Sequence, residues 1–390
     1  MLNGEENKLK KILYISTFLP YKNSKFPAAG SNTTLNNIKN LHQAGNIIDY
    51  CALVNENEYR YKEECKNEYL NNIILFKITK LGKILNILFN FTLPTFCSVR
   101  YDKRIKKFLR ENQENYDVTI LDFTQNISYL KNIDKCKKIL IEHDISFQAY
   151  ERKKENEKNI IKKFLYDFEY KRLKRYEEKM ISKFDIVIVQ NKKDFNLIKN
   201  INRNIKILQP FYNKFEITRQ KNNKNINIGF FGAMNRPENE EAVIFFLERI
   251  WNSICDKDIY FYIIGANPSE KLKEISSKYE NVILTGFVDD VKKYFSLLDI
   301  GVIPLFKGAG IKVKTIEMLY SEIPVVSTTV GIEGILAEDK KEFLLAETEE
   351  EFIKNIKILK NNQKLYKEIK NNLKNKKNCL IKGQNIDNII

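Results

Sequence analysis

Short runs of β-branched and aromatic residues alternate with longer segments of helical periodicity along this sequence, and the alternation occurs in two separate blocks. Strands that alternate with helices pair in parallel, because each helix returns the chain to the end of the sheet where the previous strand began. Residues 213–225 are polar and have no period, so they are the predicted linker. The chain has 390 residues, and one hydrophobic core stops growing at about 250 to 300 residues. Two domains are therefore expected.

The composition and bounds of each run place the elements of both blocks. The predicted strands lie at 11–17, 47–54, 73–78, 117–123, 137–144, 185–190, 205–210, 226–234, 259–266, 282–287, 299–305 and 323–328. The main predicted helices lie at 30–45, 147–180, 238–254 and from 349 onward.

These elements predict an α/β fold of two Rossmann-like parallel-sheet domains, residues 1–215 on the acceptor side and residues 226–365 on the donor side. A helical tail, residues 366–390, could cross back to the first domain. Ligands of such sheets bind at the carboxyl ends of the strands. The functional site is therefore expected in a cleft that those ends of both sheets face.

Basic residues outnumber acidic ones by 66 to 50, which gives a net charge of +16. Such an excess attracts polyanions, and the candidate partners are nucleic acid, anionic lipid and phosphate-bearing small molecules. An equally weighted interpretation is compositional, since Lys, Asn and Ile are abundant together, as expected when a genome has a biased nucleotide content. The charge is spread along the chain without aromatic stacking motifs, which disfavours a nucleic-acid-binding protein.

Cysteine and histidine usage argues against a structural metal or a disulfide scaffold. Six cysteines are scattered without a CxxC pair, and the chain has two histidines. The N-terminal sequence MLNGEENKLKKILYIST has no long apolar stretch before a small-residue cleavage site, so it does not resemble a secretion signal. The expected location is the cytoplasm.

A phosphate-binding turn is predicted in the stretch KGAGIKVKTIEMLYSEIPVVSTTVGIEG, residues 307–334. A strand is followed by Gly308 and Gly310 and then by a helical pattern, so backbone N–H groups and the helix dipole would favour an anion there. Lys312 and Lys314 add positive charge in the same turn, where cations are otherwise disfavoured. An anionic ligand is the favoured explanation.

Glu317 lies about 10 Å along the helix from the glycine turn, on the same face, which suits a ribose beyond a diphosphate. A carboxylate there could accept hydrogen bonds from two neighbouring hydroxyls. The alternative is a solvated i,i+3 ion pair between Lys314 and Glu317, worth a few tenths of a kcal/mol. The glycine context favours the ligand.

At these residues the sequence resembles the family 4 glycosyltransferases (group 1 retaining transferases), which share the two-domain GT-B fold. The similarity covers residues 225–335, including FFGAMNRPENEEAVIFFLERIW and LTGFVDDVKKYFSLLDIGVIPL. The N-terminal half is similar only loosely, at 27–41 and 141–153. The resemblance implies a hexosyltransferase-type enzyme with a nucleotide-sugar donor and a glycan or lipid-linked acceptor.

The resemblance also implies roles for individual residues. Glu317 matches the glutamate that binds the nucleotide ribose, and the glycine-lysine turn matches the segment that holds the diphosphate. Arg236 matches a second cation on the diphosphate, Phe287 and Val288 match the place where the base meets the backbone, and Gly232 lies in the matched strand end. Position 309 is alanine, where the family usually has the glutamate that contacts the donor sugar, so the sugar cannot be read from the sequence.

His143 follows a predicted strand in the first domain, at the end that faces the cleft. The resemblance implies a catalytic role for it, and a hydrogen-bonded structural role is an equally weighted alternative. Asp144 could orient the imidazole or cap the next helix. Gly30 lies where the family has a glycine loop on the acceptor side.

Several functional expectations follow from these matches. The sequence has no pair of aspartates of DxD type that demands a metal, so we expect a metal-independent enzyme with no cofactor that retains anomeric configuration. A bacterial surface polysaccharide or glycoconjugate pathway is expected by analogy. The competing interpretations are a GT-B-fold sugar-nucleotide epimerase and, less favoured, a basic nucleic-acid-binding protein.

Residues 78–111 combine apolar residues with flanking Lys and Arg. Asn and Pro residues interrupt the stretch, so it is not a transmembrane helix. Either a pair of helices packs on the first sheet, which is slightly favoured, or an interfacial element docks on anionic lipid at the inner face of the membrane.

Overall fold

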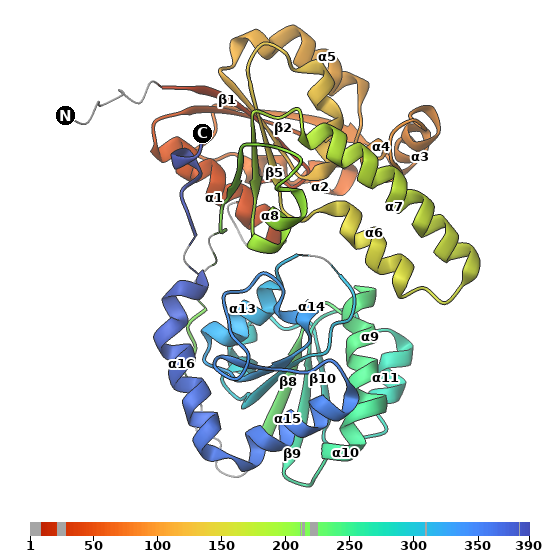
Figure 1. The fold of residues 1–390 in the computed structure, drawn as a ribbon, viewed down its shortest axis with the longest axis vertical. Helices are drawn as coiled ribbons and strands as arrows, with labels where there is room; N and C mark the ends of the chain where they lie inside the picture. The colour runs from red at the N-terminus through yellow and green to blue at the C-terminus, as the bar shows by residue number, and fades with distance from the viewer. Residues whose placement is uncertain are drawn as a thin grey trace, which may run out of the picture. The chain divides into compact units, whose positions relative to one another are not determined.

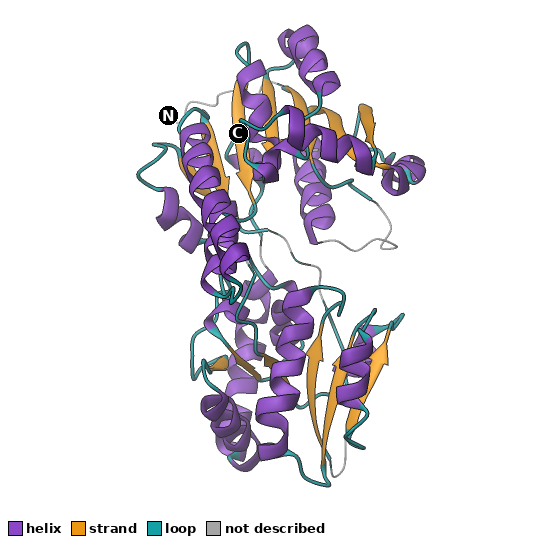
Figure 2. Ribbon diagram, turned by 90° about the vertical axis from the view of Figure 1, so that its right-hand side faces the viewer, coloured by secondary structure: helices purple, strands orange, loops and turns teal. Residues whose placement is uncertain are grey.

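The computed structural model describes residues 9–21, 29–210, 212, 215–218, 225–308, 310–381 and 383–390. The chain divides into two compact units. Unit 1 consists of Met1–Phe211 together with Gly383–Ile390, and unit 2 consists of Tyr212–Lys382. Each unit contains one parallel sheet with helices on both faces (Figures 1 and 2).

Unit 1 is built on a seven-stranded sheet with the order β3-β2-β1-β4-β5-β6-β7, in which all neighbouring strands are parallel. The strands are β1 Lys11–Ser16, β2 Ile47–Asn55, β3 Asn72–Ile78, β4 Val118–Asp122, β5 Lys137–Glu142, β6 Ile186–Val189 and β7 Ile205–Ile207. The strand order reverses between β1 and β4. In sheets of this kind the carboxyl ends of the two strands at the reversal flank a ligand crevice.

The helices of unit 1 connect these strands. They are α1 Ala29–Gln43, α2 Glu56–Arg60, α3 Lys80–Phe89, α4 Thr95–Ser98, α5 Lys103–Asn112, α6 Ser146–Glu155, α7 Ile160–Ile181 and α8 Lys192–Ile198, with 3-10 turns η1 Lys62–Cys65, η2 Gln113–Asn115 and η3 Thr124–Asn132. Both faces of the sheet are buried, since Leu13 and Ile15 of β1 join one apolar cluster while Ile12 and Tyr14 join another. This explains why the strands read as almost continuous apolar runs.

The single long helix predicted at 147–180 is wrong, because the chain forms the separate helices α6 and α7 there. Asn159 is the N-cap of α7, and its side chain accepts hydrogen bonds from the backbone N–H groups of Ile161 and Lys162. Asparagine caps a helix by this means, so it starts a new helix at this point.

Unit 2 is built on a six-stranded parallel sheet with the order β10-β9-β8-β11-β12-β13. The strands are β8 Ile226–Phe231, β9 Ile259–Ile264, β10 Val282–Gly286, β11 Ile300–Ile303, β12 Val325–Ser327 and β13 Phe343–Leu345. The helices are α9 Pro237–Phe245, the π-helical turn η4 Phe246–Trp251, α10 Asn252–Ile254, α11 Glu270–Ser276, α12 Val291–Phe295, α13 Val313–Tyr320, α14 Thr329–Ile332, α15 Glu349–Asn361 and α16 Gln363–Ile381. The strand order reverses between β8 and β11.

The chain returns to unit 1 after α16. The 3-10 turn η5, Ile386–Asn388, buries Ile386 in the apolar cluster that covers one face of the first sheet. The Nζ atoms of Lys10 and Lys137 both donate to the carbonyl of Ile390 at 3.1 Å. Residues 383–390 are therefore part of unit 1, while α16 packs against α13 in unit 2. Among the described residues, no helix has the length and apolar character that crossing a bilayer requires.

Candidate functional site

The strand reversal of unit 2 brings several predicted donor-binding residues together. Gly232 follows β8, and the turn of Gly308 and Gly310 follows β11, so both stand at the carboxyl ends of the two strands that flank the reversal. Gly308 has a φ of 108° and Gly310 a φ of 76°, which are backbone conformations that favour glycine. Ala309, which stands where the similar family usually has a sugar-contacting glutamate, lies outside the described residues.

The helix α13 begins at this turn with an uncapped N-terminus. Its N-cap residue is Lys312, which makes no side-chain cap, and the first turn contains no acidic residue. The Lys312 ammonium donates to the carbonyl of Gly310 instead. The positive end of the helix dipole is therefore left with cationic neighbours, as predicted from the sequence.

The half-buried side chain of Lys314 lies close to two other cations, Lys312 and Arg236. Burial, together with the positive charges of Lys312 and Arg236, lowers the pKa of Lys314 to about 7, while Glu238 acts in the opposite direction. The Nζ atom lies 4.4 Å from the centroid of the Phe230 ring. An anion placed among the three cations would restore the charged form of Lys314, because an opposite charge favours ionisation.

Asn239 holds Lys314 in this position, and the sequence analysis missed it. Its Oδ1 accepts a hydrogen bond from the Lys314 ammonium, and its Nδ2 donates to the carbonyl of Ala233 at 2.8 Å. A helical asparagine looks like an ordinary surface residue in sequence, yet Asn239 is only 4% exposed. The hydrogen bond between Lys314 and Asn239 thus joins α13 to α9.

The side chain of Glu317 on α13 is half-buried, and its carboxyl group makes no hydrogen bond or ion pair with any described residue. Burial alone raises the pKa of its carboxyl group to about 7. The alternative ion pair with Lys314 does not form, because the Lys314 ammonium is bonded to Asn239. A desolvated carboxyl group without a partner is costly, and hydroxyl donors from a ligand would remove that cost.

Two glycines, Gly232 and Gly265, lie at the strand ends close to Lys314. A Cβ atom on Gly232 would lie 2.8 Å from the Lys314 Nζ, and a Cβ on Gly265, at the end of β9, would lie 1.9 Å from the Gly232 carbonyl oxygen. Gly265 is therefore needed for the close approach of these strand ends, whereas a side chain at Gly232 would displace the ends of the Lys314 and Asn239 side chains.

The remaining predicted donor-side residues follow the strands β8 and β10, at the same end of the sheet. Arg236 is exposed at the N-cap of α9. Phe287 follows β10 and is 75% exposed, and Val288 is half-buried beside it. An exposed aromatic side chain at a strand end fits a surface that a ligand base would cover.

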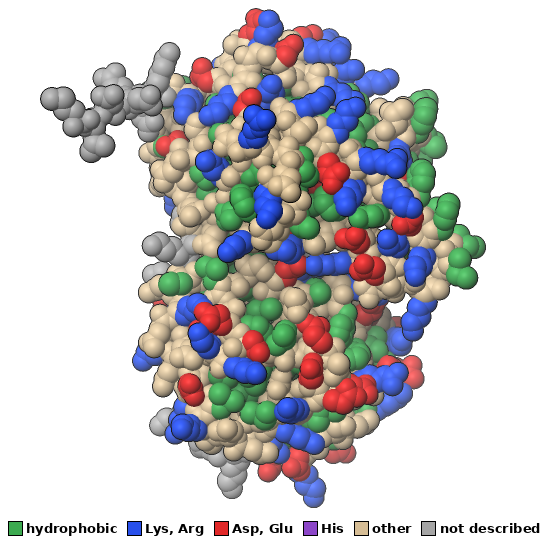
Figure 3. Space-filling model, viewed as in Figure 1, with side chains coloured by type: hydrophobic (Ala, Val, Ile, Leu, Met, Phe, Trp, Pro, Cys, Tyr) green, Lys and Arg blue, Asp and Glu red, His purple; other side chains and the backbone are tan. Residues whose placement is uncertain are grey.

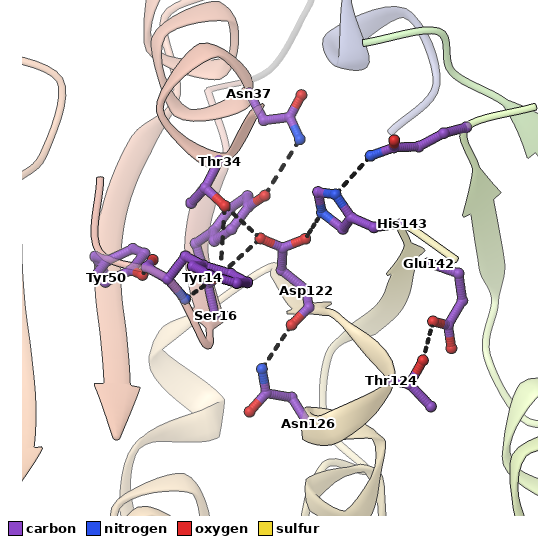
Figure 4. A network of polar contacts seen from close by, with 12 residues as sticks. Tyr14, Ser16, Thr34, Asn37, Tyr50, Asp122, Thr124, Asn126, Glu142 and His143 are labelled. Carbon is purple, nitrogen blue, oxygen red and sulfur yellow. Dashed lines mark hydrogen bonds and ion pairs between the residues drawn. The ribbon is translucent and has the colours of Figure 1, made fainter. Parts of the chain in front are cut away.

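A second polar network lies at the strand reversal of unit 1 (Figure 4). Asp122 ends β4 and is fully buried, and its Oδ2 accepts hydrogen bonds from Ser16 and Thr34, both at 2.8 Å. Its Oδ1 lies 2.7 Å from Nε2 of His143, and Nδ1 of His143 lies 2.6 Å from the amide nitrogen of Gln190. The amide N–H donates to Nδ1, so Nε2 carries the proton that it donates to Asp122.

Asp144 does not orient the imidazole, because both ring nitrogens of His143 are taken by Asp122 and Gln190. Nor does it provide the helix cap, since the N-cap residue of α6 is Ile145, which makes no side-chain cap. Both roles expected for Asp144 are wrong. No pattern in the sequence points to Asp122 and Gln190, because they end or follow strands that are distant in sequence.

Aromatic stacking fixes the ring of His143 as well. It lies parallel to the ring of Phe123, with 3.7 Å between centroids, and Phe123 adopts a φ of 74° that bulky residues rarely accept. Phe123 in turn packs on Phe18. A Cβ atom on Gly30 would lie 2.8 Å from Phe18 and 3.1 Å from Phe123, so this glycine makes room for the aromatic pair.

A carboxylate pair anchors the helix that follows His143. Glu177 of α7 accepts hydrogen bonds from the backbone N–H groups of Ser146 and Phe147, at 2.9 and 3.0 Å, and so caps α6. Burial raises its pKa to about 8, and burial together with the charge of Glu177 raises the pKa of Glu142. The Oγ1 of Thr124 donates to Glu142.

In the described part of the chain, no group of three His, Cys, Asp or Glu side chains could hold a metal ion.

Comparisons with known proteins agree with this architecture. An uncharacterized 44.6 kDa protein in the cps region of Klebsiella pneumoniae is 27% identical over 370 residues, which cover 89% of this chain and 90% of that protein. The structure of sucrose-phosphate synthase from Thermosynechococcus elongatus matches with a TM-score of 0.67 and 13% identity, over 97% of this chain and 96% of that one. HepE from Anabaena in complex with UDP-glucose matches with a TM-score of 0.62 and 11% identity, over 95% of each chain.

Two parallel-sheet units with these neighbours define the GT-B class of glycosyltransferases, and the chain has this fold. Residues 225–362, which include the whole glycine-lysine turn, match the family of group 1 glycosyl transferases. The chain is therefore a glycosyltransferase with a group 1 domain in unit 2.

Proposed function

We propose that this enzyme transfers a sugar from a nucleotide-sugar donor to a glycan, lipid-linked or other glycoconjugate acceptor, with retention of anomeric configuration and without a divalent metal. The observation that carries the proposal is the half-buried Glu317 carboxyl group, which has no side-chain partner among the described residues and follows Lys314, one of a cluster of three cations, by three residues on the same helix. A nucleoside diphosphate satisfies both, since it offers ribose hydroxyls and negative phosphate oxygens.

In this proposal the cations act on the leaving group. Lys314, Lys312 and Arg236 neutralise the charge that builds up on the diphosphate as the bond to the sugar breaks, and the N–H groups at the start of α13 contribute in the same direction. Lys314 is poised for this role because burial has already lowered its pKa, so an approaching diphosphate draws a proton onto it. No metal is then required for charge neutralisation.

His143 acts in this proposal on the acceptor side together with Gly30 and Asp144. Its ring nitrogens are engaged by Asp122 and Gln190, so direct contact with a reacting group requires one of these bonds to open. In the present arrangement His143 joins the ends of β4 and β6 through its bonds to Asp122 and Gln190. The proposed pathway is assembly of a bacterial surface polysaccharide, which the cps region of the Klebsiella relative supports.

Titration calorimetry with UDP and GDP, in the presence and absence of a chelator, tests the donor side. UDP is the first probe because the Anabaena neighbour was solved with UDP-glucose. Binding to wild type that survives chelation, and weakens in Glu317→Gln but not in the exposed control Glu274→Gln, supports the proposal. A strict requirement for Mg²⁺ or Mn²⁺ contradicts metal independence.

Product analysis tests the reaction. With a competent acceptor, NMR of the product should show the anomeric configuration of the donor. An epimerase of the same fold would instead convert the nucleotide-sugar without any acceptor, so an acceptor-free control separates the two activities.

A further inference from the structure

Large apolar side chains that are exposed to solvent are concentrated on two helices of unit 1. Among the described residues, seventeen such side chains are at least 36% exposed, and eleven of them belong to α3, its C-terminal neighbour Phe91 and the first half of α7. We call these eleven residues the apolar ridge: Leu81, Ile84, Leu85, Leu88, Phe89, Phe91, Ile160, Ile161, Phe164, Leu165 and Phe168. Monomeric proteins rarely expose apolar residues in such concentration, so the ridge marks an interaction surface.

The helix α3 contributes to the ridge because it packs against very little. None of its ten residues is buried, and Leu88 and Phe89 are 63% and 75% exposed. The packed helix pair that was slightly favoured for residues 78–111 is therefore wrong for α3. It is correct only for the later part, where α5 buries Ile105 and Leu109.

The first half of α7 behaves in the same way. No residue of this helix is buried before Leu173, and Ile160, Ile161 and Phe164 are 84%, 73% and 69% exposed. A helix half that exposes its apolar residues on this scale is expected to bury them elsewhere.

Side-chain contacts tie the two helices into one surface. Arg172 of α7 donates to the carbonyls of Phe91 and Leu93, which follow α3, and also to Glu169 at 2.8 Å. The Oε2 of Glu169 accepts from the backbone N–H of Thr95 at 3.0 Å. Apolar side chains accordingly line the same edge of unit 1, over α3 and α7, with basic side chains beside them (Figures 1 and 3).

A basic pocket adjoins the ridge at the C-terminal end of α3. It has a volume of about 550 Å³ and is lined by Asn90, the C-cap of α3, and by four cations of α5: Lys103, Lys106, Lys107 and Arg110. Glu111 also lines it and lies 3.7 Å from Lys107. Residues 77–112 contain nine Lys and Arg residues and only two Asp and Glu residues.

The positive charge beside the apolar ridge decides which partner fits this surface. A second copy of this chain would bring the same cationic surface against itself in an isologous dimer, which like-charge repulsion opposes. A bilayer with anionic headgroups offers an apolar interior for the ridge and phosphates for the pocket. We propose that α3 and the first half of α7 dock unit 1 on an anionic membrane, with lipid phosphates in the basic pocket.

Vesicle co-sedimentation tests this surface with the full chain. Wild type should bind phosphatidylcholine vesicles that contain phosphatidylglycerol and should bind pure phosphatidylcholine vesicles weakly, with binding that falls as salt rises. Removing three pocket charges in Lys103→Gln/Lys106→Gln/Lys107→Gln should lower the partition coefficient roughly a hundredfold, at about fivefold per cation. The matched control is Lys257→Gln/Lys271→Gln/Lys278→Gln on exposed lysines of unit 2, which should change binding little.

The apolar ridge is tested by Phe164→Ser/Phe168→Ser, with Leu197→Ser/Leu336→Ser as a control at exposed apolar residues elsewhere. The ridge variant should lose about tenfold or more in partitioning while the control does not. Both should keep the nucleotide affinity of wild type, so failure of the docking surface is distinguishable from failure of the proposed donor site.

Three results would overturn the proposal. Equal binding to neutral and anionic vesicles at every salt concentration would remove the role of the pocket. A concentration-dependent dimer that Phe164→Ser/Phe168→Ser abolishes would assign the ridge to a second copy. Binding to a soluble oligonucleotide that competes with vesicles and ignores the loss of both phenylalanines would assign the surface to polyanions in general.

Discussion

The strand reversals of the two units contain polar groups at equivalent places in their sheets, but the groups differ in how they are satisfied. In unit 1, Asp122 accepts hydrogen bonds from three side chains, and His143 has a partner on each ring nitrogen. In unit 2, Lys314 is half-buried among other cations, and the Glu317 carboxyl group has no partner among the described residues. A satisfied network stabilises its unit, whereas an unsatisfied one lowers stability until a ligand binds.

This contrast predicts that mutations at the strand reversal of unit 1 lower stability and leave nucleotide affinity unchanged. Mutations at the strand reversal of unit 2 should do the reverse. Asp122→Ala should lower the free energy of unfolding of unit 1 by about 3 to 5 kcal/mol, because three donors lose a buried acceptor. Nucleotide affinity should stay near that of wild type. Scanning calorimetry and titration calorimetry measure the two quantities, and Glu114→Ala, which removes an exposed ion pair with Lys135, is the control. Loss of nucleotide binding in a folded Asp122→Ala protein would break the comparison.

Lys314→Met should show the reverse. The variant keeps an apolar stem over Phe230 but removes the ammonium, so nucleotide affinity should fall about a hundredfold. The free energy of unfolding should change by less than about 1 kcal/mol, since the lost bond to Asn239 is offset by relief from burying a charge. Lys257→Met, at an exposed lysine of the same unit, is the control for both measurements. A large loss of stability with unchanged affinity would make Lys314 a structural residue.

Glu317→Gln should weaken nucleotide binding by about ten- to a hundredfold, because a neutral amide accepts weaker hydrogen bonds from hydroxyls. It should also stabilise unit 2 at alkaline pH. The folded-state pKa of Glu317 is raised to about 7, so its contribution to stability is present below the unfolded pKa and is lost as the pH rises through 7. Denaturation at pH 5 and pH 8 should therefore show a much larger gain over wild type at pH 8 than at pH 5. An identical pH dependence in both proteins would contradict this.

The smallest expected effect is the pH dependence of donor binding. Affinity for UDP-glucose should be highest near pH 7, because Lys314 loses its proton above that value and Glu317 gains one below it. A change of one pH unit to either side should lower the affinity about threefold. Titration calorimetry of the variants sharpens the assignment, since Glu317→Gln should lose the acidic limb and Lys314→Met the alkaline limb. A flat profile for wild type would show that neither group titrates on binding.

The fold could be predicted from the sequence because the evidence for it is local. Each strand of both sheets except β13 coincides with a predicted run, and the structure confirms two parallel sheets. The strand β13 was missed because three residues, Phe343–Leu345, carry no usable period. The break between α6 and α7 was missed although Asn159 is a favourable N-cap, because the charged pattern continues across it.

The sites could be predicted only where one stretch of chain carries the signal. The turn from Gly308 to Glu317 is contiguous, so its cations and its carboxylate could be read together. Asp122, Gln190 and Asn239 meet their partners only through the tertiary fold, and each looks like an ordinary strand end or helix surface in sequence. A pattern within one segment does not reveal partners that another segment supplies.

The contact between Gly265 and the carbonyl of Gly232 limits how this enzyme could be redesigned. A side chain at either position would collide with main chain or with Lys314, so the surface on which a donor would rest cannot be reshaped by substitution there. Attempts to alter donor preference should therefore randomise the loop at Phe287 and Val288, where one side chain is exposed and the other half-buried. Libraries that include the two glycines should yield mostly misfolded or inactive clones.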